Sequence, residues 1–235
     1  MISPPNVGAL HDSVLTALGT EIVSGGLPPG QVINLDGVGT THGVSRSVAR
    51  EAIRVLESMG MVASRRRVGI TIQPQERWNV FDPRVIRWRL ASSDRAAQLI
   101  SLSELRRGFE PAAAALAATR ANPHHCRIMA AAVSDMVMHG RSGDLEAYLL
   151  ADKVFHQTLL EASGNEMFRA LNGVVAEVLT GRTHHGMMPE TPNPVAIELH
   201  DEVARAIRMR DEAAAERAMR AIIDEAMSGV SSTAE

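Results

Sequence analysis

Cysteine is almost absent from this sequence, since Cys126 is the only one among 235 residues. A single thiol excludes an intrachain disulfide framework and a four-cysteine zinc site, and it suits a reducing compartment. Aromatic residues are also scarce, at 3% of the chain, whereas hydrophobic residues make up 45%. The core must therefore consist of Ala, Leu, Val, Ile and Met, and Ala, Leu and Met lose little side-chain freedom in helices. The composition favours a mainly helical fold.

Long apolar runs are missing as well. No stretch reaches the roughly 18 uninterrupted apolar residues that a membrane-spanning helix needs. The N-terminus lacks the basic and then apolar pattern of a secretory signal, so we expect a cytoplasmic protein. The net charge of −3 excludes a strongly basic chain. Any surface for nucleic acid has to arise from local segregation of charge.

The first third of the chain is divided by glycine and proline. Apolar residues at helical spacing, together with Ser45 as a helix N-cap, predict three helices and then two short strands. The expected helices span about 7–24, 36–42 and 45–59, and the expected strands span 61–63 and 70–72 on either side of a basic turn. This order of elements is that of a winged helix-turn-helix.

The rest of the chain has a helical pattern. Residues 75–93 are typical of a linker with a short helix, and they carry Trp78 and Trp88. The expected helices beyond it span about 94–120, 123–139, 143–163, 165–185, 194–209 and 211–228. Pro111 is expected to kink or restart the first of these. The sequence predicts a head of residues 1–74, a linker of residues 75–93 and an all-helical body of residues 94–235.

Basic residues gather on the third helix and in the turn after it. Arg46, Arg50 and Arg54 recur every four residues, so they share one face of the helix. A solvated face with Arg–Glu pairs is the alternative, but like charges four residues apart do not stabilise a helix. We therefore expect this face to bind double-stranded DNA. The candidate DNA contacts are Ser45, Arg46, Ser47, Arg50, Arg54, Arg66 and Arg67.

Three short motifs in this region resemble the recognition helix of the GntR family of transcription regulators. They are Ser45-Arg46, Arg50-Glu51 and Leu56-Glu57-Ser58-Met59-Gly60-Met61. The resemblance implies DNA contacts by Ser45, Arg46, Ser47 and Arg50 and by the wing around Arg66 and Arg67. One departure stands out. The family's second helix starts with a Pro-Ser-Glu-Arg-type motif whose Arg touches DNA, whereas Asn34-Leu35-Asp36 occupies that place here.

The helical body carries three groups with possible chemistry. Asp152 and His156 share a helix face and could bind one metal ion. His200 lies beside apolar residues, where a histidine is often a hydrogen-bonded core residue. Arg106 precedes Glu110 by one turn, so it could form an intrahelical pair or clamp an anion.

The body resembles the FCD effector domain of FadR-type GntR regulators. The matching motifs are Leu105-Arg106-Arg107-Gly108-Phe109-Glu110-Pro111, Asp152 and His156 running into Glu161-Ala162-Ser163-Gly164-Asn165, and Glu198-Leu199-His200. The resemblance implies a Zn-like divalent metal ion on Asp152, His156 and His200, with Ile222 at the place of the family's usual fourth ligand. Loss of the metal with retention of a polar anion pocket is the alternative.

The resemblance also implies a small organic acid as effector. Its expected contacts are Arg106, Asp152, His156, Asn165 and His200. The linker around Trp78 and Trp88 resembles that of galactonate-operon repressors, which implies a sugar acid.

Together these features predict a mainly α protein, with an N-terminal winged helix-turn-helix and a C-terminal all-α antiparallel helical bundle. The expected function is that of a homodimeric repressor of a catabolic operon, not an enzyme, which binds operator DNA and responds to an organic acid. One alternative is a metal-dependent hydrolase or lyase built on Asp152, His156 and His200, with Glu161 or Glu198 as base. Another is a metal-loaded structural domain without effector.

Overall fold

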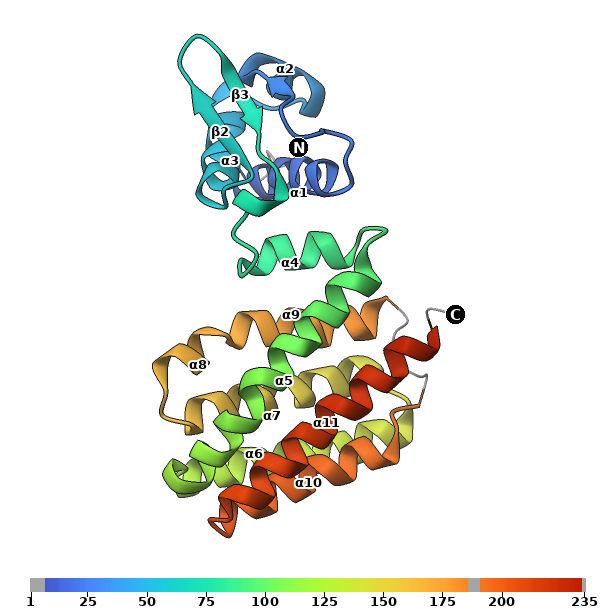
Figure 1. The fold of residues 1–235 in the computed structure, drawn as a ribbon. Helices are drawn as coiled ribbons and strands as arrows, with labels where there is room; N and C mark the ends of the chain where they lie inside the picture. Colours follow the sequence, from blue (N-terminus) through green and yellow to red (C-terminus); the bar gives the residue numbers. More distant parts are fainter. Residues whose placement is uncertain (1–6, 186–190, 234–235) are drawn as a thin grey trace. The chain divides into compact units, whose positions relative to one another are not determined.

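The computed structural model of this chain describes residues 7–185 and 191–233, and the side chains of residues 10–185 and 191–228. The chain divides into two compact units, residues 1–93 and 94–235. The first unit combines helices with a small sheet, and helices make up the second (Figure 1). The predicted mainly helical fold, with a winged helix-turn-helix followed by a helical bundle, is confirmed.

In its described residues, the N-terminal unit has three helices around a three-stranded sheet, followed by a short fourth helix. Its helices are α1 (Val7–Val23), α2 (Leu35–His42), α3 (Arg46–Ser58) and α4 (Pro83–Leu90), with a 3-10 turn at Gln75–Arg77. The antiparallel strands β1 (Val32–Ile33), β2 (Val62–Arg65) and β3 (Gly69–Ile72) are arranged in the order β1-β3-β2. The short strand β1 was not predicted from the sequence, because two residues are too few to show an alternating pattern.

Local hydrogen bonds explain where α2 and α3 begin. The side chain of Asn34 accepts a hydrogen bond from the Gly37 amide at 2.7 Å, and Ser45 caps α3 by accepting from the Val48 amide. Helix α3 is strongly amphipathic, because Ala52 and Leu56 are buried against α1 and the sheet while its arginines are exposed. Burial of one face therefore leaves the basic face of α3 open to solvent.

Helix α4 lies in the segment whose sequence predicts a linker. It packs against α1 through Trp88, whose ring lies so close to Gly19 that a Cβ atom at position 19 would overlap it. Trp88 belongs to the apolar core of the N-terminal unit. The short helix expected in this segment is therefore part of the first compact unit.

The C-terminal unit contains seven helices in its described residues. They are α5 (Arg95–Arg120), α6 (Pro123–Ser142), α7 (Leu145–Ala162), α8 (Glu166–Ala170), α9 (Asn172–His184), α10 (Pro194–Arg208) and α11 (Glu212–Thr233). The longest helices, α5 and α11, run antiparallel side by side (Figure 1). Small buried residues of α5, such as Ala114 and Ala118, let the helices approach closely. Helix α7 contacts α5, α6 and α9, and it lies at the centre of the bundle.

One predicted helix is confirmed and two need correction. The helix expected over residues 94–120 is observed as α5, which has 26 residues in all and contains Pro111. The proline removes one backbone donor, but packing against α11 and α7 holds both halves of α5. The helix expected over residues 165–185 is divided at Leu171 into α8 and α9. Gly140 lies inside α6, and the helix ends at Gly143, whose φ of 73° is left-handed. No described helix is long and apolar enough to cross a membrane.

Gly60 offers a test of how the end of α3 is packed. Its φ is +72°, and a Cβ atom at this position would overlap the carbonyl oxygen of Arg77. We expect Gly60→Ala to lower the free energy of unfolding by about 3 kcal/mol, because strain and overlap with rigid backbone add together. Urea denaturation measures the change.

Gly25→Ala is the matched control for this test. Gly25 has a similar φ of +81°, but a Cβ atom added there would meet nothing within 4 Å. It should cost only about 1 kcal/mol of backbone strain. Equal losses in the two variants would contradict the close packing of Gly60 on Arg77.

Candidate functional site

The C-terminal unit encloses a small cavity of about 40 Å³. Helices α5, α7, α9, α10 and α11 and the segment before α10 line it. The lining residues are Arg106, Tyr148, Asp152, His156, Leu179, Arg182, Pro192, Asn193, Ala196, His200, Ile222 and Glu225. Polar and charged side chains make up much of this wall, so the cavity suits a polar occupant.

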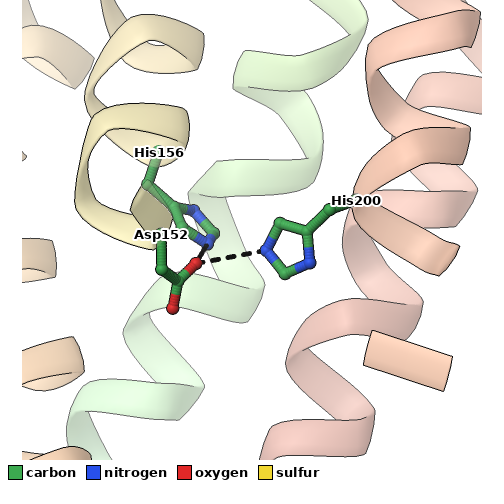
Figure 2. Close-up of side chains that lie close together, drawn as sticks. All are labelled: Asp152, His156 and His200. Atoms are coloured by element: carbon green, nitrogen blue, oxygen red, sulfur yellow. Dashed lines mark ion pairs between the residues drawn. The ribbon is translucent and has the colours of Figure 1, made fainter. Parts of the chain in front are cut away.

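Three potential metal ligands meet at this cavity (Figure 2). Asp152 and His156 are one turn apart on α7, and His200 reaches them from α10. Asp152 Oδ1 lies 3.4 Å from His156 Nε2 and 3.2 Å from His200 Nε2. One ligand atom from each residue lies within 4.8 Å of the other two. The structure therefore brings together the three residues that the sequence suggested.

Each imidazole is held through its other nitrogen. His200 Nδ1 donates a hydrogen bond to the Ala196 carbonyl at 2.6 Å. His156 Nδ1 lies 2.7 Å from Glu110 Oε2. Carbonyl and carboxylate oxygens only accept hydrogen bonds, so both contacts favour a proton on Nδ1. They leave Nε2 of both rings facing Asp152, as in histidines that bind metal with an outer partner, and Arg106 Nη2 also lies 3.4 Å from His156 Nε2.

The polar atoms of this cluster fit a divalent metal ion. Asp152 Oδ1 and His200 Nε2 are buried and lie 3.2 Å apart, and neither has any other hydrogen-bond partner among the described residues. Buried polar atoms are normally satisfied, so these two call for an occupant. One carboxylate and two imidazoles form a ligand set that suits zinc and leaves a coordination position open. Ile222 lines the same cavity and offers no ligand atom.

Arg106 is paired with Glu110 inside the bundle. The two side chains are 2% and 0% exposed, and Arg106 Nε and Nη2 donate to the two Glu110 oxygens at 2.5 and 3.3 Å. Burial by itself would raise the pKa of Glu110, but the charges of Arg106 and His156 lower that pKa to about 2. Burial likewise opposes the charged form of Arg106, yet Glu110 raises the pKa of Arg106 above its ordinary value. The pair therefore stays ionised, and Glu110 neutralises Arg106.

Arg182 of α9 is a second cation at the cavity, and the sequence analysis missed it. Its Nε atom is enclosed and has no hydrogen-bond partner in the described part of the chain. Burial and then the charge of Arg106 lower the pKa of Arg182, so this cation lacks full compensation. No motif surrounds Arg182 in the sequence, and only the packing of α9 brings it to the cavity.

Three further polar groups of the wall were also missed. Asn193 donates a hydrogen bond to Glu225 Oε1 at 2.8 Å, and Tyr148 lies beside them in the lining. Asn165, which we expected to contact an effector, is not part of this lining. Its side chain accepts from the Met167 amide and caps α8 instead. Asn165 is therefore a helix cap, and its contact with an effector stays a prediction.

The N-terminal unit presents a basic surface on α3 and on the β2–β3 turn. A groove of about 560 Å³ runs over it, and its lining includes Arg46, Arg50, Arg54, Arg66 and Arg67. All five arginines are exposed, as are Ser45 and Ser47 at the start of α3, whose hydroxyls lie 2.9 Å apart. The predicted DNA contacts thus lie on one surface.

Acidic groups occupy part of the same surface. Arg54 Nη1 lies 3.4 Å from Glu51 Oε2, which is an Arg–Glu pair of the kind expected for a solvated face. Glu57 instead accepts a hydrogen bond from the Ser64 amide at 2.8 Å and ties β2 to α3. Arg46 Nε lies 3.4 Å from Asp36 Oδ1.

The buried Arg106–Glu110 pair makes a testable contribution to stability. Glu110→Gln leaves the Arg106 charge buried without its anion, so the free energy of unfolding at pH 7 should fall by about 3–5 kcal/mol. Because the pKa of Glu110 is lowered from about 4.5 to about 2, its stabilisation is complete above pH 4.5 and is lost as the pH falls towards 2. Chemical denaturation at several pH values should show a smaller acid-side loss in the variant than in the parent.

Asp224→Asn supplies the control for that measurement. Asp224 of α11 accepts from Arg107 Nε at 2.6 Å in an exposed pair, and Arg107 is the neighbour of Arg106 on α5. Water screens this pair, so its loss should change stability far less than the loss of Glu110. An equal effect of both variants would contradict the special role of the buried pair.

Comparison with known proteins matches each of the two units to a known domain family. The profile of bacterial regulatory proteins of the gntR family matches residues 10–72, and that of the FCD domain matches residues 101–225. The galactonate operon transcriptional repressor of Escherichia coli (strain K12) is 27% identical over 209 residues, which are 88% of this chain and 90% of the repressor. The HTH-type transcriptional regulator LutR of Bacillus subtilis (strain 168) is 26% identical over 204 residues, or 84% and 90% of the two chains.

A solved structure agrees with these matches. Streptococcus agalactiae GntR superposes with a TM-score of 0.51 and 25% identity, over 95% of this chain and 99% of that chain. The resemblance inferred from the recognition-helix and body motifs is therefore confirmed. The chain belongs to the gntR family of bacterial regulatory proteins, with an FCD domain C-terminal to its winged helix-turn-helix.

Proposed function

We propose that this protein is a homodimeric cytoplasmic repressor of a catabolic operon, and that a small organic acid bound in its FCD domain changes its affinity for operator DNA. The observation that carries the proposal is the exposed arginine surface of α3 and the wing in a chain whose net charge is −3. Membership of a family of regulators leaves the hydrolase or lyase alternative without support.

The basic surface has the side chains that a DNA-binding protein uses to contact phosphates and bases. Ser45 and Ser47 stand at the N-terminus of α3, where hydroxyls and backbone amides can bind phosphate. Arg46 and Arg50 follow on the exposed face and suit bidentate recognition of guanine in the major groove. Arg66 and Arg67 in the wing would contact the neighbouring backbone. A two-fold dimer would read a pseudo-palindrome whose half-sites are about one helical turn apart or closer.

The charges around the cavity favour an anionic effector. Glu110 neutralises Arg106, so the wall retains the cation of Arg182 and the carboxylates of Asp152 and Glu225. With neutral imidazoles the described residues of this wall have one negative charge in excess, and with a divalent cation on the three ligands they have one positive charge in excess. A single carboxylate neutralises that charge, and Arg182 is the side chain best placed to hold it.

The metal would supply an attachment point for an effector oxygen in its open coordination position. Asp152, His156 and His200 would hold the ion, and Glu110 and the Ala196 carbonyl would keep the two imidazoles oriented. The cavity of about 40 Å³ has room for a carboxylate group rather than for a whole sugar acid. The hydroxyls of a sugar acid would extend towards Tyr148, Asn193 and Glu225. The similarity to a galactonate operon repressor supports this effector class.

The proposed DNA binding predicts that substitutions on α3 and on the wing weaken the affinity for DNA in different ways. Arg46→Ala should weaken specific binding by about 1–3 kcal/mol, because it removes a base contact. Arg66→Ala should weaken binding to all sequences evenly and reduce the salt slope by about one, because it removes a phosphate contact. Fluorescence polarisation on the protein's own promoter region measures both, and unchanged affinity in both variants would refute the assignment.

The effector part predicts that Arg182 is needed for binding of a carboxylate. Arg182→Met should reduce the affinity for galactonate at least tenfold, or about 1.4 kcal/mol, in calorimetry on zinc-loaded protein. Zinc affinity should stay near that of the parent. Arg169→Met removes an exposed cation of α8 and is the control for net charge. Preferential binding of neutral or cationic ligands by the parent would show that the effector is not an anion.

A further inference from the structure

Asp36 is an unexpected carboxylate on the DNA-facing surface. It lies in the first turn of α2 and lines the same groove as the arginines of α3 and the wing. In the family resemblance this position belongs to an arginine that touches DNA. An acid there repels phosphates, so its presence needs a reason other than attraction to the DNA backbone.

The position of Asp36 is well defined by its surroundings. Asn34 caps α2, and the Thr40 hydroxyl donates to the Asp36 carbonyl at 2.9 Å. The carboxylate lies near the N-terminus of α2, which stabilises a negative charge. Glu57, the other acid of the groove lining, is engaged by the Ser64 amide. Asp36 is therefore the carboxylate of this groove that faces an arginine of the recognition helix.

The contact between Asp36 and Arg46 uses one side of the guanidinium. Asp36 Oδ1 lies 3.4 Å from Arg46 Nε, and both side chains are largely exposed, at 73% and 63%. A guanidinium is a planar fork with five donors, so a carboxylate beside Nε leaves the terminal Nη1 and Nη2 edge available. Reading guanine needs two N–H groups of one edge directed at O6 and N7. The carboxylate can therefore restrain Arg46 without blocking the edge that reads a base.

We propose that Asp36 is a positioning and specificity-determining residue, which orients Arg46 for one guanine in each half-site and penalises binding elsewhere. This inference rests on the proposed DNA-binding function. On the correct site, the ion pair reduces the side-chain freedom that Arg46 loses on binding. On other sites, Asp36 repels phosphate and competes for the Arg46 guanidinium. The same carboxylate thus raises specific affinity and lowers non-specific affinity.

The experiment is a selection of binding sites from a random duplex library with full-length protein, followed by polarisation titrations. Sites are selected with the parent, with Asp36→Asn and with Glu51→Gln. Glu51→Gln is the matched control, because it also removes one negative charge beside an arginine of α3, here Arg54. Each protein is then titrated with the parent's selected site, with that site altered at the guanine assigned to Arg46, and with random DNA. That guanine is the one whose replacement costs the parent affinity but leaves Arg46→Ala unaffected.

We expect Asp36→Asn to bind random DNA several-fold more tightly and the selected site several-fold more weakly. Its discrimination against the altered guanine should fall at least tenfold. Glu51→Gln should bind both the selected site and random DNA more tightly and should keep the discrimination against the altered guanine. Asp36→Glu should restore part of this discrimination. In an Arg46→Ala background, Asp36→Asn should have no further effect on it.

Two results would overturn the inference while leaving the proposed function intact. Equal tightening on specific and random DNA by Asp36→Asn would show that Asp36 is only a charge on the surface. A loss of discrimination that adds to that of Arg46→Ala would show that Asp36 contacts a base itself. Failure of the parent to select any sequence would instead refute the DNA-binding function on which the inference rests.

Discussion

The stability of the C-terminal unit and the geometry of its candidate metal site both depend on the Glu110 carboxylate. It is fully buried on α5, where it accepts two hydrogen bonds from Arg106 and lies 2.7 Å from His156 of α7. One anion thus compensates a buried cation and orients a candidate metal ligand on another helix. Removal of a partner from such a buried pair is costly because the remaining charge keeps its desolvation penalty. Stability and site geometry are therefore linked through one side chain.

This dependence assigns different roles to the two cavity arginines. Arg106 is held by Glu110, so it supports the bundle and contributes little free positive charge. Arg182 has an enclosed Nε without a partner in the described residues, and it lines the same cavity as Ile222, which offers no ligand atom. A metal ion and a carboxylate would compensate the charges that the protein leaves unbalanced. A ligand that binds in this way can shift an equilibrium only if it favours one arrangement of the protein over another.

The charges of the basic surface in the N-terminal unit stay exposed to water, whereas those at the cavity of the C-terminal unit are buried. The apolar face of α3 packs against α1 and the sheet, and the arginines remain exposed. Exposed ion pairs contribute little to stability, so pairs such as Arg46–Asp36 are free to serve recognition. The two units thus use arginine differently, as a buried and neutralised support in one and as an exposed donor in the other.

Local signals were enough to determine much of this protein from its sequence. The helix cap at Ser45, the arginine stripe of α3 and the shared face of Asp152 and His156 all depend on residues within one or two turns. Only the tertiary structure decided that Arg182 and His200 meet Asp152 at one cavity, and that Glu110 of α5 contacts His156 of α7. These outcomes depend on the packing of helices that are distant in the sequence, and no local spacing encodes which of their faces come together.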